Sequence, residues 1–302
     1  MSKNKLFANL KKITPLYLIL FLFLFFYVFV LCIPLLWAAT SSVKTASQFR
    51  VDPIGFFPNA PFAKWGWNNY VNVMQAFNLK VSSGAGFKTV YLPEMVWNTI
   101  LFAVGALVIS LTSEYIVAYA VTRFRYKFNK VIYTTVIVTM IIPIVGTLPA
   151  QMTLMQNLGL LNSVFGVWIR SISFGGTTFL ILYAALLCVP YEYTEAGYMD
   201  GASELRIMVQ IIFPMVRNIL FILGLQSFIG LWNDYQTPLL YMPSYPTFAY
   251  GLFKFNDNAN TLVASVPSKL AGCMLIMFPI LVVFFVFRKK MMGGLNMGGL
   301  KG

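Results

Sequence analysis

Long apolar runs separated by short polar segments dominate the pattern along the chain. The first run, Pro15–Ala39, has 25 residues and no charged side chain. As an α-helix it would be roughly 37 Å long, which exceeds the ~30 Å hydrocarbon core of a bilayer. The run is also longer than the apolar core of a usual signal peptide, so we expect an uncleaved transmembrane helix. Five further spans follow at Met95–Ala120, Val131–Ala150, Ile172–Val189, Asn218–Asn233 and Leu270–Phe287. The pattern predicts an all-α polytopic membrane protein with six transmembrane helices in one domain, residues 1–302.

Composition and charge support this class and suggest an orientation. The 302 residues are 59% hydrophobic and only 10% charged, whereas soluble domains carry about a quarter charged residues. Of the 22 Lys and Arg residues, 14 lie before the first span, between the second and third, between the fourth and fifth, or after the sixth. The positive-inside rule then makes the N-terminus (1–14), segment 190–217 and the tail (288–302) cytoplasmic, and loops 40–94 and 235–268 external. Because the cations flank apolar spans, we expect lipid and no nucleic acid as a partner.

The chain lacks the residues that most enzymes and metal sites use. It contains no His, and its three cysteines all fall inside apolar runs, where they are expected to be small core residues. The segment Ser83–Thr89 approaches a nucleotide-binding P-loop, but Phe87 stands where the glycine before the lysine is required. We therefore expect no catalytic residues, no metal and no cofactor in this chain, and an energy source in another subunit.

The segment 190–217 has the pattern of a short helical hairpin. Tyr191–Met199 can form about two helical turns, and Asp200-Gly201 supplies a turn in which glycine tolerates a positive φ. Ser203 is placed to cap a second helix, Glu204–Phe213, which Pro214 would separate from the fifth span. The sequence thus predicts a short helix lying across the cytoplasmic end of the bundle.

The charge of this hairpin distinguishes two kinds of partner. Glu192, Glu195, Asp200 and Glu204 are four of only nine acidic residues in the chain. Amphipathic connectors that rest on lipid headgroups are usually rich in lysine on their polar face. An acidic connector would be repelled by an anionic membrane, so its charge favours a cationic groove on another protein.

The hairpin motif resembles a known family. Glu-Ala-x-x-x-Asp-Gly-Ala, followed by an apolar pair and proline, is similar to the EAA loop of binding-protein-dependent ABC importer permeases, with Glu195, Ala196, Gly201 and Pro214 at the motif's spacing. Gly197 departs from the usual second alanine, which should weaken the first helix by roughly 0.5–1 kcal/mol. Residues 232–240 and the glycine-rich tail 293–302 resemble the carbohydrate-uptake subfamily, in particular the smaller permease of maltose-type systems.

The resemblance implies an architecture and a set of partners. It implies a type I ABC importer permease fold with a cytoplasmic coupling helix, in the bacterial-type plasma membrane. A second permease, expected to make a heterodimer, would pair with this chain, two ATPase subunits would bind ATP and Mg, and an extracytoplasmic protein would deliver a sugar. Glu195, Ala196 and Asp200 would contact the ATPase, Gly201 would permit the turn, and Pro214 would fix the joint to the fifth span.

Four polar residues in the spans are candidates for the solute pathway or its gate. They are Glu114, Gln226, Asn233 and Asp234. A carboxyl group inside a membrane span costs a few kcal/mol unless it is paired or faces a cavity. Each residue could equally tie neighbouring helices together, and for Glu114 a structural hydrogen bond is the favoured interpretation.

Two alternatives to a sugar importer remain at this stage. An ABC permease for another solute, such as glycerol phosphate, an amino acid or a peptide, would share the EAA loop. An ion-driven secondary carrier would need paired intramembrane charges, and the spans offer only Glu114.

Overall fold

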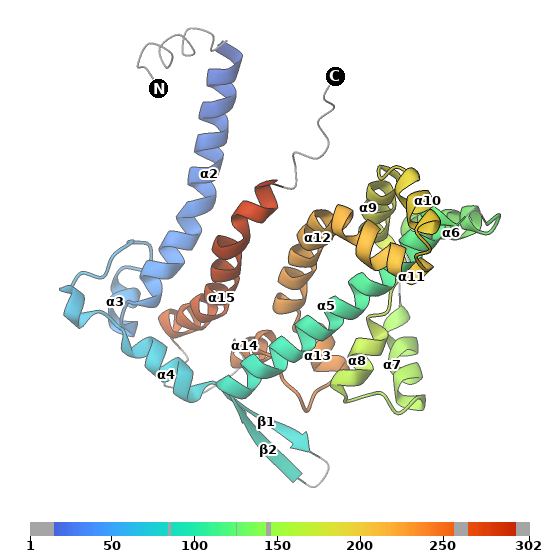
Figure 1. Cartoon of the computed structure of the whole chain (residues 1–302). Helices are drawn as coiled ribbons and strands as arrows, with labels where there is room; N and C mark the ends of the chain where they lie inside the picture. Colours follow the sequence, from blue (N-terminus) through green and yellow to red (C-terminus); the bar gives the residue numbers. More distant parts are fainter. Residues whose placement is uncertain (1–14, 84–85, 125, 143–145, 257–264, 294–302) are drawn as a thin grey trace. The chain divides into compact units, whose positions relative to one another are not determined.

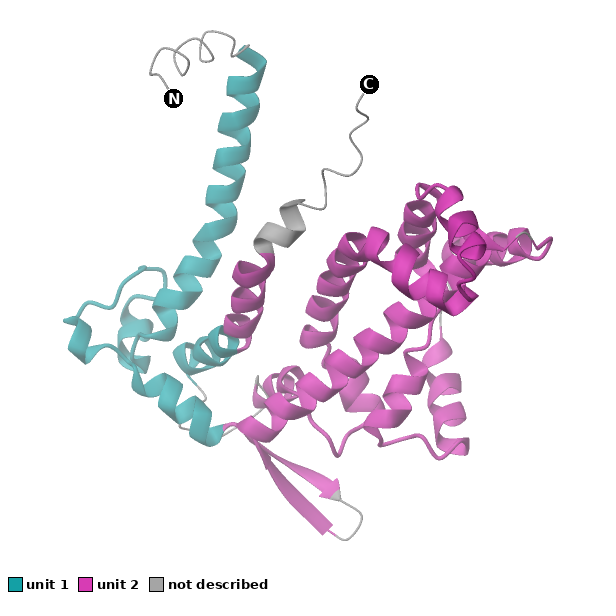
Figure 2. Cartoon of the chain, in the orientation of Figure 1, with its two compact units in different colours: residues 1–76, 258–275 teal, residues 77–257, 276–302 magenta. Residues whose placement is uncertain are grey.

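The computed structural model describes residues 15–83, 86–124, 126–142, 146–256 and 265–293. By contacts the chain divides into two compact units, one of residues 1–76 with 258–275 and one of residues 77–257 with 276–302 (Figure 2). The two are described separately below. The N-terminal residues 1–14, most of the tail and residues 257–264 of the predicted loop 235–268 lie outside the described residues.

The first unit begins with one long apolar helix. Helix α2 (Pro15–Ser42) exposes large apolar side chains along most of its length, as expected for a helix surrounded by lipid or by other membrane helices. After it come α3 (Ala46–Val51), the 3₁₀ helix η1 (Phe62–Lys64) and α4 (Asn68–Ala76). Lys44 is only 1% exposed, and its ammonium group donates to the carbonyl groups of Asp52 and Gly55. These acceptors offset the cost of burying a charge and order the start of segment 40–94.

Helix α5 is the central element of the second unit (Figure 1). It covers Leu92–Arg123 and packs against α8 (Val164–Arg170), α9 (Gly176–Leu187) and α12 (Phe213–Asn233). One core cluster joins α5, α9 and α12 around buried residues that include Tyr115, Tyr119, Phe179, Leu182, Ile207 and Val216. A second cluster joins Phe102 of α5 to Met155 of α7 (Thr147–Asn157) and Tyr241 of α13 (Gln236–Tyr241).

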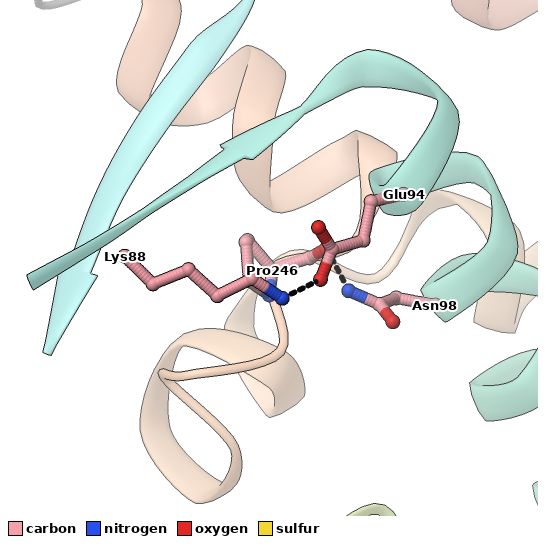
Figure 3. Close-up of polar contacts among 4 residues, drawn as sticks. All are labelled: Lys88, Glu94, Asn98 and Pro246. Atoms are coloured by element: carbon pink, nitrogen blue, oxygen red, sulfur yellow. Dashed lines mark hydrogen bonds and ion pairs between the residues drawn. The ribbon is translucent and has the colours of Figure 1, made fainter. Parts of the chain in front are cut away.

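The N-terminal end of α5 is fixed by polar contacts. An antiparallel hairpin of β1 (Asn78–Ser83) and β2 (Gly86–Tyr91) leads directly into α5, an addition to the expected all-helical pattern. Lys88 of β2 pairs with Glu94, and Asn98 Nδ2 donates to the Pro246 carbonyl at 3.1 Å (Figure 3). Thr99 Oγ1 accepts the backbone N–H of Phe248, the first residue of α14 (Phe248–Asn256), at 2.8 Å.

The expected set of six spans is only partly confirmed. In the described residues, four helical stretches are long and apolar enough to cross a membrane: Pro15–Ser42, Leu92–Arg123, Glu204–Asn233 and Val266–Phe287, the last within α15 (Val266–Gly293). The fourth predicted span corresponds to α9, which starts at Gly176 instead of Ile172 and forms, with α10 (Glu192–Met199), a pair bent by 69°.

The third predicted span is wrong as one continuous helix. Helix α6 (Asn129–Ile141) stops two residues before Pro143, and α7 begins again after Gly146, which has φ +82°. A residue before proline is disfavoured in the helical region, and glycine adopts a positive φ without strain. The apolar composition of 131–150 concealed this break.

Candidate functional site

The hairpin between α9 and α12 has a closed and well-defined turn. Helix α10 ends at Met199, and Gly201 follows with φ +73°. The Ala202 N–H donates to the Gly197 carbonyl and the Gly201 N–H to the Tyr198 carbonyl, both at 2.9 Å. This pair of hydrogen bonds is a Schellman motif, whose left-handed position strongly favours glycine. The predicted turn at Asp200-Gly201 is therefore confirmed.

Gly197 allows the two arms of the hairpin to approach closely. It is buried in α10, and a Cβ atom at this position would lie 2.9 Å from Ile207 Cγ1 and 3.0 Å from Ile211 Cδ1. Both distances are shorter than ordinary carbon contacts of about 3.5–4.0 Å. The departure from alanine at this position thus has a packing reason that the sequence alone did not reveal.

The second arm differs from the predicted capped helix. Ser203 occupies the N-cap position of α11 (Glu204–Arg206), but its side chain makes no capping hydrogen bond. A π-helix, η2 (Ile207–Ile212), continues into α12, and Pro214 lies in the first turn of α12. The prediction that Pro214 separates the arm from the fifth span is wrong, because proline is tolerated in a first helical turn. The helical stretch is continuous from Glu204 to Asn233.

Two tyrosines of α5 hold this second arm. The Tyr119 hydroxyl donates to Glu204 Oε2 at 3.1 Å, and the Tyr115 hydroxyl donates to the Met208 carbonyl at 2.8 Å. Both rings are buried in the core cluster beside Ile207. A hydrogen bond to a charged group is stronger than one between neutral groups, so Tyr119 and Glu204 make the stronger of the two connections.

One turn further along α5, Arg123 holds the end of α9, which leads into the first arm. Its side chain is 5% exposed, and Nη2 donates to the carbonyls of Leu186 at 3.0 Å and Val189 at 2.9 Å. Leu186 lies in the last turn of α9, and Val189 lies two residues beyond its end. The Leu186 carbonyl also accepts the Val189 N–H, so Arg123 adds a second donor where helix carbonyl groups lose their regular partners. Sequence analysis treated Arg123 only as a topological cation, and neither it nor the two tyrosines was identified as a site residue.

The outer surface of the hairpin combines carboxylates with apolar side chains. Glu195, Ala196 and Asp200 are all exposed, as the docking prediction requires. Met199 is 88% exposed and Leu205 68% exposed. These two apolar residues were not predicted as site residues, although their place near the Asp200-Gly201 turn could have indicated them. A surface that combines carboxylates with exposed apolar side chains suits a partner cleft that is both apolar and cationic.

The four candidate pathway residues do not form one site. Glu114 is 7% exposed and lies close to the Ser173 side chain, while Gln226 is exposed on α12. Asn233 donates to the Ile229 carbonyl at 2.9 Å within its own helix. Asp234 accepts the Thr237 N–H at 3.0 Å and so helps to begin α13. The contacts of Glu114, Asn233 and Asp234 are those of structural residues, and their role in transport stays a prediction.

A groove lies beside the second arm in the second unit. It has a volume of about 1130 Å³ between α5, the second arm, α12 and the part of α15 near Phe287. Most of its lining is apolar, with Thr112, Arg217 and Asn218 among the polar exceptions. None of the four candidate residues lines it. In the described part of the chain, no three His, Cys, Asp or Glu residues are grouped so that they could hold a metal ion.

The characterised proteins that the chain resembles in sequence include permease proteins of bacterial transport systems. The chain is 30% identical over 211 residues to the maltodextrin transport system permease protein of Bacillus subtilis, covering 68% of this chain and 74% of that protein. It is 23% identical over 274 residues to the diacetylchitobiose uptake system permease protein of Streptomyces coelicolor, covering 89% and 84%. A bacterial ABC transporter involved in alginate import contains a chain with the same fold, with TM-score 0.72, 20% identity and coverage of 96% and 98%.

The family model that matches extends over the helices and the hairpin described above. It covers residues 114–291, more than half of the chain, and includes α9, both arms of the hairpin and α12. The apolar helices and the exposed acidic hairpin agree with this match. The chain belongs to the family described as binding-protein-dependent transport system inner membrane components.

Proposed function

We propose that this protein is the membrane-spanning permease subunit of an ATP-driven importer that brings a sugar or oligosaccharide into the cytoplasm. In this proposal the hairpin faces the cytoplasm, both termini lie on the same side, and the chain itself performs no catalysis. The observation that carries the proposal is the hairpin, whose turn is fixed by a Schellman motif while its carboxylates and Met199 remain exposed. This is the geometry of a docking element, because the backbone is held and the contact side chains are free.

A separate ATPase is the partner that this surface fits. Glu195 and Asp200 would pair with cations at the rim of an ATPase cleft, while Met199 and Leu205 would fill its apolar floor. ATP and Mg would be bound by that ATPase. Nucleotide-driven closure of the ATPase pair would move the hairpin, and the helices packed on it would alternate between inward-open and outward-open arrangements.

The proposed solute class rests on the relatives. The proteins most similar to this chain include permeases named for maltodextrin, galactooligosaccharides and diacetylchitobiose. An extracytoplasmic binding protein would deliver the sugar, and a second, different permease would complete the pathway. A non-sugar solute is the second candidate, because one relative is named as a permease for osmoprotective compounds. Family membership removes the support for an ion-driven carrier.

Docking is tested by co-purifying the permease complex with its ATPase. The double variant Glu195→Lys with Gly201→Pro reverses one contact charge and destroys the left-handed turn, so we expect the permease to insert normally but to lose the ATPase. Glu94→Lys, a charge reversal near the β-hairpin, is the matched control and should retain it. A double variant that still co-purifies and transports like the wild type would contradict the docking role.

The solute is tested on the intact complex with its binding protein. Maltodextrins, galactooligosaccharides, diacetylchitobiose and glycerol phosphate are each added, and stimulation of ATP hydrolysis is measured in proteoliposomes. Stimulation by a saccharide supports the proposal. Stimulation by glycerol phosphate alone would support the non-sugar alternative.

A further inference from the structure

The contacts that hold the hairpin arise from one stripe of α5. Tyr115, Tyr119 and Arg123 are spaced four residues apart, and residues at this spacing lie on one face of a helix. They reach the second arm at the Met208 carbonyl and at Glu204, and they reach the end of α9 through Arg123. The second arm, and the end of α9 that leads into the first arm, are therefore tied to the same helix by hydrogen bonds as well as by apolar packing.

The opposite end of α5 is tied just as specifically to external segments. Asn98 and Thr99 hydrogen-bond the backbone at Pro246 and Phe248, and α5 begins directly after strand β2. With 32 residues, α5 has a length of roughly 48 Å at 1.5 Å per residue. Figure 1 shows it running from the β-hairpin to the region of α10 and α11 within the second unit.

The second arm contains an irregular element next to these ties. Residues Ile207–Ile212 form a π-helix, and Tyr115 donates to the Met208 carbonyl inside it. π-Helical turns are uncommon, and they occur frequently at functional sites. The arm is thus regular at Glu204, where Tyr119 holds it, and irregular just beyond, where it joins α12.

We propose that α5 is the rigid connector that carries the movement of the hairpin to the external surface, and that Tyr119 and Glu204 are the positioning residues that couple the hairpin to it. The inference rests on the proposed function. The π-helix lets α12 change its angle to the hairpin while the tie to α5 stays intact. Apolar contacts in the core cluster can slide past one another, whereas the hydrogen bond at Glu204 fixes direction and distance. Loss of this bond introduces slack between the ATPase and α5.

The test measures movement at the far end of α5. Trp97 is 58% exposed near that end, and Trp97→Cys, with the three native cysteines replaced by serine, carries a bimane fluorophore. The reconstituted complex of permease pair, ATPases and binding protein is then given ATP with vanadate. The nucleotide-dependent emission change and the rate of ATP hydrolysis are recorded together, so no solute needs to be known.

The variants separate coupling from folding. Tyr119→Phe keeps the ring and removes the hydroxyl, and Glu204→Ala removes the acceptor, whereas Glu204→Gln keeps an acceptor oxygen. We expect Tyr119→Phe and Glu204→Ala to keep the ATPase and its hydrolysis while the emission change falls about fivefold. Glu204→Gln should recover most of the signal. The double variant Tyr119→Phe with Glu204→Ala should behave like either single variant, because both remove the same bond.

The matched control is Tyr126→Phe, because Tyr126 is 67% exposed and lies beyond the end of α5. This variant should leave both the emission change and the rate of ATP hydrolysis unchanged. An undiminished emission change in Tyr119→Phe and Glu204→Ala would overturn the inference. So would a loss of ATPase binding in both, which would assign these residues to assembly alone. If the wild-type complex shows no ATPase binding and no nucleotide response, the proposed function fails and the inference fails with it.

Discussion

Gly197 offers a direct test of how the hairpin is packed. The substitution Gly197→Ala restores the residue that is usual in the EAA motif. Helix propensity alone predicts that alanine stabilises α10 by about 0.5–1 kcal/mol. The structure predicts the opposite sign, since the new Cβ would lie 2.9 Å from Ile207 Cγ1 and 3.0 Å from Ile211 Cδ1.

The magnitude follows from these two opposing effects. Inserting a methyl group into a packed interface typically costs ~1–3 kcal/mol. Ile207 is fully buried at 0% exposure, so it has little room to move away. Subtracting the gain in helix propensity leaves a net destabilisation of about 1 kcal/mol for the closed hairpin.

Hydrogen exchange followed by mass spectrometry measures this quantity locally. A destabilisation of 1 kcal/mol corresponds to roughly fivefold faster exchange in peptides from α10, if the hairpin opens as a local unit. Ala196→Gly is the matched control at the neighbouring exposed position, where only helix propensity changes. The double variant Gly197→Ala with Ile211→Val removes one of the two close contacts, so the alanine should cost less in that background.

Two results would refute the reasoning. Slower exchange in Gly197→Ala would show that helix propensity outweighs the contacts with the isoleucines. An equal cost of the alanine with and without Ile211→Val would show that the two residues do not interact as their distances indicate.

Three further predictions concern the ends of α5 and the turn. Gly201→Ala forces alanine into φ +73° and should destabilise the turn by ~1–2 kcal/mol, seen as faster exchange of the turn amides. Arg123→Met keeps an apolar stem but removes the donor to the carbonyls of Leu186 and Val189. A cost of ~1–3 kcal/mol should lower the thermal unfolding midpoint of the purified complex, and an unchanged midpoint would count against the capping role. Asn98→Ala loses the buried hydrogen bond to the Pro246 carbonyl and should lower the free energy of unfolding by ~1–3 kcal/mol. Glu94→Gln, at the exposed ion pair, should lower it by less than about 1 kcal/mol in the same measurement. Equal costs for the two variants would contradict the expected difference between the buried hydrogen bond and the exposed ion pair.

The outline of the fold and the location of the hairpin could be predicted because both depend on local composition. Long apolar stretches identify membrane helices by length alone. Asp200-Gly201 indicates a turn because only glycine adopts a positive φ without strain. The break after Ile141 was missed because an apolar composition is the same for one continuous helix and for two shorter ones. The continuity through Pro214 was missed for a related reason, since proline can end one helix or begin the next.

The sequence by itself determined that the chain has membrane-spanning helices, and it singled out one acidic hairpin whose motif is typical of a transport family. These properties are carried by residues that lie close together along the chain. Only the tertiary structure decided that Gly197 lies against Ile207, that Tyr119 meets Glu204, and that Arg123 caps α9. The contacts of Tyr119 and Arg123 join residues 85 and 63 positions apart, and that of Gly197 crosses the hairpin turn. All three form only when packing of the helices fixes which faces meet. The hairpin was therefore visible in the sequence, whereas the helix to which it is attached was not.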